Sequence, residues 1–337
     1  MKMKKRFAAV ILFFLMVFLF VLLTNDEILR SMQLPMMGQS ADMDVSCYEK
    51  LSTRDSFPEF NTPKERIRLA SGKNIFFHET SCFESGRSEL NCRQACAVES
   101  AARMNPSTSV NLLFLSPSPP SNRTARLVDL VLQSYRNVRV MRVQVDEYVR
   151  DSPIEQWYAS GILGSSHWPR SHMSDIMRSL EDLTDFAGAE DWMDVAAGVI
   201  GFGATGLGRR VANACLRDLM RNFRGNLWGN NGPGVITRTL QKFCAVEHAK
   251  DMTSSRCSGF RVFPPSAFYP IFYKEWRRYF SAQDFNETMR LIQEARAIHV
   301  WNKLSATEVV RVGSKVPYAI VAQKHCPRVY SNCGSTF

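Results

Sequence analysis

An apolar segment close to the N-terminus constrains this chain more than any other feature. Phe7–Leu23 contains no charged residue and is almost wholly apolar, and it is preceded by four cations, Lys2, Lys4, Lys5 and Arg6. As a helix it would span roughly 25 Å, close to the thickness of the hydrocarbon core of a bilayer. Flanking cations favour a cytosolic N-terminus and a lumenal remainder. We therefore predict a cytosolic tail at 1–6 and a transmembrane signal-anchor at 7–23.

A cleaved signal peptide is the competing interpretation of this segment. Its apolar region would be shorter, and small residues would mark the cleavage site. The sequence Thr24-Asn25-Asp26-Glu27 follows the segment and is a poor cleavage site. The signal-anchor is therefore favoured.

The next segment, residues 24–72, is the predicted stem. It has scattered polar residues, no sustained hydrophobic period, and three prolines, Pro35, Pro58 and Pro63. Such a composition is typical of a linker. It would hold the globular part, residues 73–337, away from the membrane.

The cysteines and two glycosylation sequons indicate an oxidising compartment. The chain has nine cysteines, and the sequons begin at Asn122 and Asn286. An odd count leaves at least one thiol unpaired or paired between chains. Cys47 is the candidate, because it stands alone in the stem. It either links two chains in a disulfide-bonded dimer or pairs with Cys82, Cys92 or Cys96, and both alternatives are open.

From residue 73 onward, strand and helix patterns alternate. Strands are predicted at Asn74–Phe77, at Val110–Leu115 and at the alternating Met141, Val143 and Val145. Helices are predicted between them at Ala95–Arg103 and Leu127–Tyr135. Strands separated by helices indicate an α/β fold with a mainly parallel sheet, which binds ligands at the carboxyl ends of its strands. His78-Glu79-Thr80 falls at one such end.

The second half of the chain continues this alternation. Val195–Phe202 is a predicted strand, Gly234–Phe243 a helix, Arg261–Ile271 irregular or edge structure, and Ala297–Trp301 a final short strand. A further helix carries Val211, Cys215, Leu219 and Phe223 at every fourth position. Cys215 lies on its apolar side, so we expect a buried free thiol.

The formal net charge of +10 suits an anionic ligand such as a nucleotide diphosphate. No block of clustered Lys and Arg of the nucleic-acid-binding kind occurs, so no nucleic-acid partner is expected.

Three groups of residues are able to bind a sugar nucleotide. Asp175 and Arg178 share one face if they lie on a helix, although a surface ion pair would explain these two residues alone. Asn230, Asn231 and Gly232 form a turn before a helix, where amides could hold hydroxyls and the helix N-terminus a phosphate; plain turn chemistry is the alternative. On a strand, His299 and Trp301 would face one way, and Trp301 could stack on a sugar or base while His299 or Asn302 reaches the diphosphate.

Several sequence blocks occur in an order that resembles one family. Ser174-Asp175-Ile176-Met177-Arg178 fits the S-D-x-x-R run that opens the donor-sugar site of a large glycosyltransferase group. The other blocks are Phe76–Ser81, Cys96–Ala102, Trp228–Pro233, Phe263–Tyr269 and His299–Lys303. From about Asn74 to the C-terminus the chain resembles the lactosylceramide 4-alpha-galactosyltransferase family of alpha-1,4-glycosyltransferases, including its insect-type members.

This resemblance implies a GT-A-like glycosyltransferase domain in the Golgi. It implies a retaining transfer of galactose or an N-acetylhexosamine from a UDP-sugar to a glycosphingolipid in alpha-1,4 linkage, with Mn²⁺ or Mg²⁺. It also implies that the donor sugar is bound by a set of residues drawn from the three groups: Asp175, Arg178, Asn230, Asn231, Gly232, His299, Trp301 and Asn302.

One segment of the family is missing from this chain. In the family, S-D-x-x-R leads through a Gly-Gly turn into a strand ending in Asp-x-Asp, which holds the metal. Here Arg178 runs straight into Ser179-Leu180-Glu181-Asp182-Leu183, and no Asp-x-Asp occurs there. The nearby carboxylates lack that spacing and are expected to be solvated, with Asp182 or Asp185 capping a turn; they are Glu181, Asp182, Asp185, Glu190, Asp191 and Asp194.

No metal ligand is therefore assigned, and two hypotheses remain. The protein is either an active transferase or a catalytically inactive Golgi-resident homologue with a partner-binding or glycan-binding role.

Overall fold

The computed structural model describes residues 57–60, 72–80, 87–116, 118–160, 176, 177, 179, 180, 182–227 and 229–337. The predicted tail, the signal-anchor, most of the stem, Cys47, Asp175 and Arg178 lie outside these residues. In the part of the chain described, no helix is both long and apolar enough to cross a membrane. Residues 44–337 form one compact unit, and the boundary predicted at residue 72 stays a prediction.

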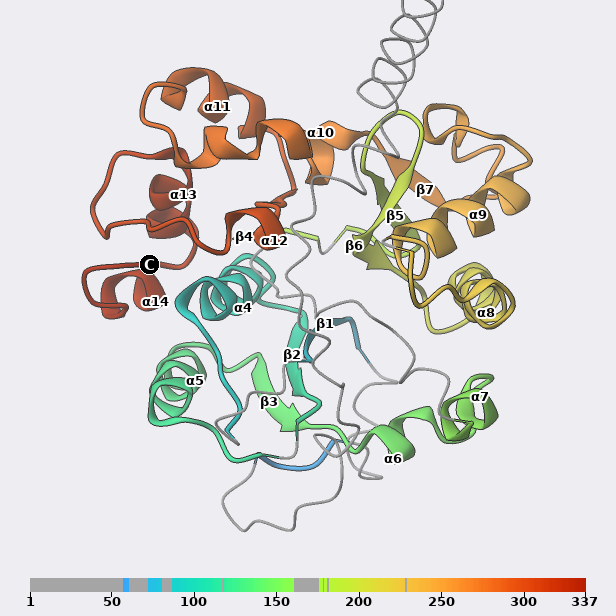
Figure 1. Cartoon of the computed structure of the whole chain (residues 1–337), viewed down its shortest axis with the longest axis horizontal. Helices are drawn as coiled ribbons and strands as arrows, with labels where there is room; N and C mark the ends of the chain where they lie inside the picture. The colour runs from blue at the N-terminus through green and yellow to red at the C-terminus, as the bar shows by residue number, and fades with distance from the viewer. Residues whose placement is uncertain are drawn as a thin grey trace, which may run out of the picture. The chain divides into compact units, whose positions relative to one another are not determined.

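The first sheet of this unit is parallel, as the alternating pattern predicted. It has the order β1-β2-β3, formed by β1 (Asn74–Glu79), β2 (Ser109–Phe114) and β3 (Val138–Arg142). Helices α4 (Cys92–Met104) and α5 (Asn122–Ser134) connect the strands and cover the same face of the sheet (Figure 1). The chain is thus α/β, and His78 and Glu79 lie at the carboxyl end of β1.

The side chains of these strands divide between the two faces of the sheet. Phe77, Leu112 and Val140 point toward the helices and join the main core, whereas Leu113 and Met141 form a small cluster with Phe60 on the other face. Both faces are therefore apolar, which is typical of a parallel strand buried on both sides.

The third strand is shorter than the alternation predicted. It ends at Arg142, and Val145 begins the short helix α6 (Val145–Val149). Asp146 and Glu147 lie in the first turn of α6. Carboxylates at a helix N-terminus are stabilised by the helix dipole. Val145 therefore begins a helix, although the alternating pattern had placed it in the strand.

Helix α4 begins and ends where its sequence indicates. The Asn91 side chain accepts a hydrogen bond from the Gln94 backbone N–H at 2.9 Å, and the Gln94 side chain accepts one from the Asn91 N–H at 2.8 Å. This reciprocal capping box satisfies two N–H groups that the helix itself leaves free. The helix stops at Asn105, the residue before Pro106.

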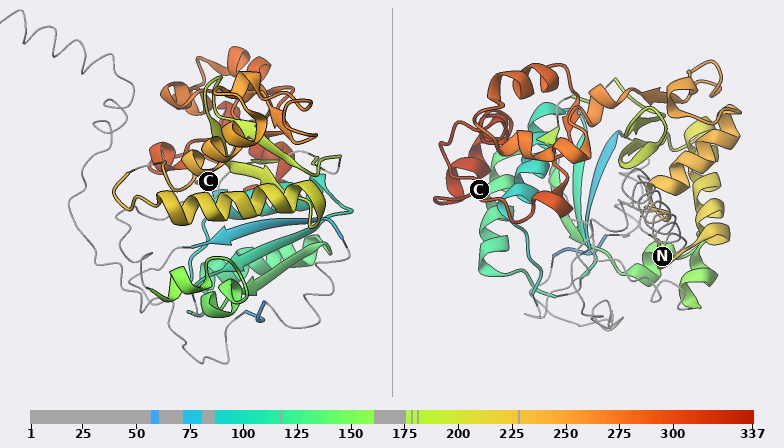
Figure 2. Two further views of the ribbon diagram at one scale, coloured as in Figure 1. Left: turned by 90° about the vertical axis from the view of Figure 1, so that its right-hand side faces the viewer. Right: turned by 45° about the horizontal axis from the view of Figure 1, so that its top comes forward.

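The second half of the unit contains a mixed sheet of order β6-β5-β7. Strand β5 (Phe186–Ala189) pairs antiparallel with β6 (Val195–Gly201) and parallel with β7 (Arg261–Phe263), which lies on the edge as predicted. Helices α8 (Gly206–Asn222) and α9 (Pro233–Cys244) pack together, and α9 packs against β6. Figure 2 shows α8 as the long yellow helix beside this sheet.

A short strand links the two halves. Strand β4 (Ile176–Met177) pairs antiparallel with β8 (Ala297–Ile298). The last strand was predicted to reach Trp301, but it ends at Ile298. Trp301 adopts a left-handed backbone conformation with φ of 53° and precedes α12 (Asn302–Ser305), so the chain turns out of the strand.

The remaining helices are short. They are α7 (Glu155–Ala159), η3 (Ala249–Asp251), α10 (Pro265–Phe268), η4 (Tyr273–Phe280), α11 (Phe285–Ile292), α13 (Pro317–His325) and α14 (Pro327–Asn332).

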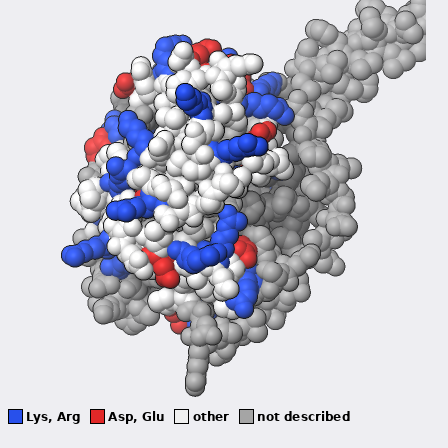
Figure 3. Space-filling view, turned by 90° about the vertical axis from the view of Figure 1, so that its left-hand side faces the viewer, with Lys and Arg blue, Asp and Glu red and all other residues white. Residues whose placement is uncertain are grey.

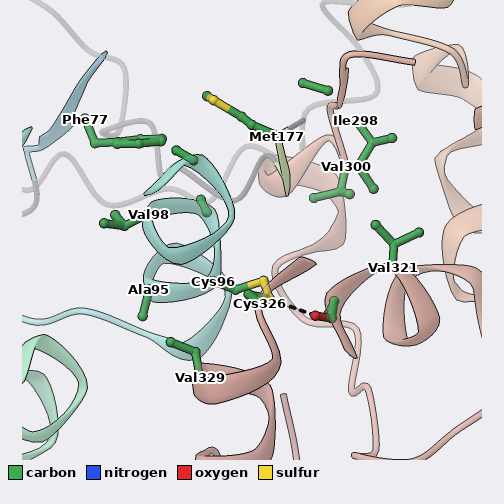
Figure 4. Close-up of a cluster of buried hydrophobic side chains, with 14 of the residues drawn as sticks. Phe77, Ala95, Cys96, Val98, Met177, Ile298, Val300, Val321, Cys326 and Val329 are labelled. Carbon is green, nitrogen blue, oxygen red and sulfur yellow. Dashed lines mark hydrogen bonds between the residues drawn. A yellow bond between two sulfur atoms is a disulfide. The ribbon is translucent and has the colours of Figure 1, made fainter. Parts of the chain in front are cut away.

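Helix α4 is the centre of the main core. Figure 4 shows Val98 on the side of α4 toward Phe77 of β1, and Cys96 on the side toward Cys326 and the C-terminal helices. The Ser100 hydroxyl accepts a hydrogen bond from the Met177 N–H at 3.0 Å, which fixes β4 against α4. The core therefore joins segments that are far apart in the sequence.

One face of α4 is tied to the C-terminal helices covalently. Cys92 is bonded to Cys333 and Cys96 to Cys326. One turn further on, the buried Glu99 carboxylate accepts hydrogen bonds from the Arg328 N–H at 3.0 Å and the Val329 N–H at 2.7 Å. The carboxylate thus caps α14 and compensates its dipole. Three successive turns of α4 hold the end of the chain.

The disulfides remove two of the partners considered for Cys47. Cys92 and Cys96 are already paired, so of the three intrachain partners only Cys82 remains. Cys244 pairs with Cys257, and Cys215 is a free, half-buried thiol, as predicted, whose pKa is raised by burial. Six of the nine cysteines are bonded and Cys215 is free, which leaves Cys47 and Cys82. Cys215 accounts for the odd count, and a dimer through Cys47 is no longer required by it.

Each of the two disulfides on α4 should limit the loss in free energy of unfolding that follows removal of the other. Cys92→Ser with Cys333→Ser leaves the Cys96–Cys326 bridge in place, so only a short loop is released. We expect a loss of about 3 kcal/mol in the free energy of unfolding, as for a loop of roughly 15 residues. Removing both bridges frees a loop whose ends are 230 residues apart and should cost more than the sum of the two separate changes.

Urea unfolding of residues 44–337 measures this effect. Cys215→Ser is the control, because it removes a sulfur without removing a bridge. Simple additivity of the two bridges would contradict the prediction.

Candidate functional site

Strand β6 presents bare backbone beside two polar aromatic side chains. Gly198 is exposed, and a Cβ atom built on it would lie 2.9 Å from the Tyr269 Oη and 3.7 Å from the His299 Nδ1. The Val199 N–H donates to the Tyr269 hydroxyl at 3.2 Å. Any side chain at residue 198 would displace this arrangement, so the strand, Tyr269 and His299 form one surface.

Aromatic rings extend this surface. The His299 and Trp301 rings are 4.6 Å apart and perpendicular, and Tyr269 lies 5.3 Å from His299 and 6.0 Å from Trp301. The Trp301 Nε1 donates to the Ile271 carbonyl at 2.8 Å, which fixes the indole. His299 and Trp301 therefore lie together as predicted, although the strand that was expected to align them ends before His299.

The backbone of Trp301 is strained. A φ of 53° is costly for a residue with a bulky side chain, and such conformations cluster at ligand sites. This conformation ends the strand and begins α12 with Asn302.

Asn302 differs from the other predicted amides. Its residue is only 8% exposed, yet its side chain makes no hydrogen bond with any described residue. Its amide atoms are not among the fully buried polar atoms that lack a hydrogen-bond partner, so they are within reach of solvent. The Asn302 amide is therefore accessible to a ligand.

The amides of Asn230 and Asn231 are fully engaged within the protein. The Asn231 Oδ1 accepts from the Arg224 N–H at 2.9 Å, and its Nδ2 donates to the Arg224 carbonyl at 3.0 Å. The Asn230 Nδ2 donates to the Asn222 carbonyl at 2.7 Å, and its Oδ1 accepts from the Arg238 Nη1 at 3.1 Å. These bonds connect the end of α8 to the start of α9, which is the turn chemistry considered as the alternative.

A buried ion pair supports the same turn. Arg238 donates from Nε and Nη2 to one oxygen of Asp218, at 2.9 Å and 2.6 Å, and Asp218 is 6% exposed. The supported turn brings Gly232 toward β6, because a Cβ built on Gly232 would lie 3.8 Å from the Cβ of Ala197. Ala197 and Gly198 are successive residues of β6, so Gly232 lies against the face opposite to Tyr269 and His299. The structure thus brings His299 and Trp301 together, with Asn302 following in the chain, and places Gly232 on the other face of β6.

A second polar pair lies at the carboxyl edge of the parallel sheet. The His78 Nε2 and the Tyr148 Oη are 3.1 Å apart. Burial lowers the pKa of His78 and raises the pKa of Tyr148, so both rings are uncharged at neutral pH.

The acidic residues after β4 are occupied elsewhere. Asp182 forms an exposed ion pair with Arg296, at 2.7 Å and 2.9 Å, which lowers the pKa of the carboxyl group. The Asp185 Oδ1 accepts from the Gly203 N–H at 2.7 Å, and so caps a turn as predicted. The described residues contain no group of three or more His, Cys, Asp or Glu that could hold a metal ion. No metal ligand is assigned among them.

Asp175 and Arg178 lie outside the described residues, and their assignment to the donor sugar stays a prediction. Sequence reasoning missed Tyr148, because the alternating pattern was extended into its helix. It also gave Tyr269 no role, although Tyr269 belongs to one of the blocks that carried the resemblance.

Comparison with known proteins identifies the relatives of this chain. Residues 204–333, which include Tyr269, His299, Trp301 and Asn302, match the family region described as "Alpha 1,4-glycosyltransferase conserved region". The chain is 28% identical over 278 residues to Lactosylceramide 4-alpha-galactosyltransferase of Homo sapiens, covering 76% of each chain.

This chain is a homologue of the alpha-1,4-glycosyltransferases. It is also 28% identical over 286 residues to Alpha-1,4-N-acetylglucosaminyltransferase of Homo sapiens, covering 78% of this chain and 81% of that protein. The resemblance drawn from the sequence blocks is confirmed, and homology supports a hexosyltransferase. Among solved structures, "PaToxG Glycosyltransferase" is similar with a TM-score of 0.38 and 13% identity over 67% of this chain and 86% of that chain.

The two kinds of amide should respond differently to substitution. Asn231→Ala removes hydrogen bonds to both backbone groups of Arg224, and we expect it to lower the free energy of unfolding by about 2 kcal/mol. Asn302→Ala removes no protein hydrogen bond and should cost below about 1 kcal/mol. Urea unfolding of residues 44–337 measures both. A larger loss for Asn302→Ala than for Asn231→Ala would contradict the assignment.

Proposed function

We propose that this protein transfers galactose or an N-acetylhexosamine from a UDP-sugar to a glycosphingolipid, in alpha-1,4 linkage and with retention of configuration. The observation that carries the proposal is the surface formed by Tyr269, His299, Trp301 and Asn302 within the matched conserved region. The two human relatives are named for galactose and for N-acetylglucosamine, which supports a hexose or N-acetylhexosamine donor.

The chemistry of this surface suits a sugar nucleotide. The faces of Trp301 and Tyr269 offer area for stacking on a sugar ring or a base. His299 and the unpartnered amide of Asn302 supply hydrogen bonds to hydroxyl or phosphate oxygens. The absence of a Cβ atom at Gly198 lets Tyr269 and His299 lie directly against β6.

The arrangement favours a transferase over an inactive homologue. An inactive protein would have no reason to keep a strained backbone conformation at Trp301, because the strain costs stability. Donor and product would both have the alpha configuration, which requires a double displacement or a same-face mechanism. No described residue of this surface stands out as a nucleophile, so neither mechanism is assigned.

The resemblance also implies a GT-A-like fold and a cation of the Mn²⁺ or Mg²⁺ kind. Of the described carboxylates that follow β4, Asp182 is engaged in an ion pair and Asp185 in a turn, so no step of the transfer is assigned to a cation. Positive charge for the diphosphate is proposed to come from Arg178, with Lys315 of the segment Gly313-Ser314-Lys315 as a further candidate.

The proposed location is the Golgi membrane, with a single pass and a lumenal C-terminal domain. The sequon residues Asn122 and Asn286 are both exposed, on α5 and α11. The disulfides on α4 also fit an oxidising lumen.

Transferase activity can be tested with the purified protein, a panel of UDP-sugars and a lactosylceramide-type acceptor. We expect an alpha-1,4-linked product, and we expect His299→Ala and Asn302→Ala each to lower kcat/KM about 10- to 100-fold. This is the range for losing one hydrogen bond to a charged or strongly polar ligand group.

Arg217→Gln, an exposed change on α8, is the control and should stay within about twofold of the parent protein. Reactions with Mn²⁺ added and with a chelator show whether a cation takes part. Absence of product with every donor, while UDP still binds, would support the inactive homologue instead.

The topology can be tested independently of activity. In cells, we expect Asn122 and Asn286 to carry glycans and the protein to remain in the membrane after carbonate extraction. Asn122→Gln with Asn286→Gln should abolish the mobility shift produced by glycosidase. Release of the full-length protein into the medium would contradict the signal-anchor.

A further inference from the structure

One face of the molecule is strongly basic. On helices α4, α5, α13 and α14 the exposed charged residues are five cations and a single acid: Arg103, Arg123, Arg126, Lys324, Arg328 and Asp129. We call the five cations the basic face. Figure 3 shows the side of the molecule on which α5, α13 and α14 lie, where Lys and Arg outnumber Asp and Glu.

The cations of the basic face are spread along the four helices, because Arg123 contacts Cys92 at the start of α4 whereas Arg103 lies at its end. The four helices pack against one another. The Arg103 Nη1 donates to the Lys324 carbonyl at 2.6 Å. Arg103 and Arg328 both lie close enough to Tyr135 for their positive charges to act on its hydroxyl group. Arg123 contacts the sulfur of Cys92, which is bonded to Cys333 directly after α14. Arg126 lies one turn along α5 from Arg123.

None of these five cations forms an ion pair with a carboxylate of the described residues. The only other acid on the four helices, Glu99, is buried and caps α14. From Arg311 to the C-terminus the sequence contains no Asp or Glu at all. The basic face is thus an extended surface of mainly positive charge on elements held by two disulfides.

The chemistry of the face selects among anionic partners. A lipid surface would be expected to engage exposed large apolar side chains together with the cations. Leu132 is the only such side chain on these four helices, whereas Trp192 and Met193 are on the β5–β6 hairpin. Four of the five cations are Arg, whose guanidinium matches the paired oxygens of a sulfate or carboxylate group. A linear acidic glycan could be bound by the cations of the basic face without any exposed apolar side chain.

We propose that the basic face binds a sulfated polysaccharide chain. This site is separate from the surface around β6 and does not depend on transferase activity. It would retain the protein near acidic glycans of the compartment in which it resides.

Binding to heparin tests the proposal. The triple variant Arg126→Gln, Lys324→Gln, Arg328→Gln of residues 44–337 should bind heparin about tenfold more weakly, because each exposed ion pair contributes roughly two- to fivefold in affinity. The matched control is Arg210→Gln, Arg217→Gln, Arg221→Gln on α8, which removes the same charge from another exposed surface. The control should stay within about twofold of the parent protein.

Further measurements distinguish the alternatives. Heparin from which sulfate has been removed should bind more weakly than heparin itself, and this comparison needs no variant. Equal losses in the two triple variants would overturn the proposal, because net charge alone would then explain binding. Tighter binding to vesicles containing anionic phospholipid than to heparin would also overturn it in favour of a membrane surface.

Discussion

The attachment of helix α4 to the C-terminal helices is the constraint on which the rest of the structure depends. Cys92, Cys96 and Glu99 occupy successive turns on one face of α4 and hold α13 and α14. The other faces of α4 pack against the parallel sheet and against β4. One helix therefore connects the first strand of the domain, the strand within the S-D-x-x-R run, and the end of the chain.

This attachment has a consequence for the functional surface. Strand β8 pairs with β4, and β4 is fixed to α4 through Ser100. The residues that follow β8 are His299, Trp301 and Asn302, so their position depends on the same core. Their geometry is set by buried contacts on one side, while the left-handed Trp301 turns the chain toward Tyr269 and β6 on the other. A rigid core next to one strained residue is a common way of holding a ligand site in place.

The three asparagines of the predicted sugar site show that the same type of side chain can have different roles in the fold. Asn230, Asn231 and Asn302 all lie in blocks that resemble the same family, and from sequence all three are equally suited to hold a sugar. The first two satisfy backbone groups between α8 and α9, and of the three only Asn302 has no partner among the described residues. The turn brings Gly232 to β6, but to the face opposite to Tyr269 and His299, because Ala197 and Gly198 are successive residues of the strand.

The sequence by itself determined the α/β alternation, the parallel first sheet, the edge position of β7, the free thiol of Cys215 and the relationship to alpha-1,4-glycosyltransferases. These features follow from local periodicity, turn residues and ordered sequence blocks, which are written along the chain. Only the tertiary structure decided that β3 ends at Arg142, that Cys92 and Cys96 pair with the C-terminus, and which asparagine has a free amide. Each of these depends on contacts between residues far apart in sequence, where packing and hydrogen bonding override local preference.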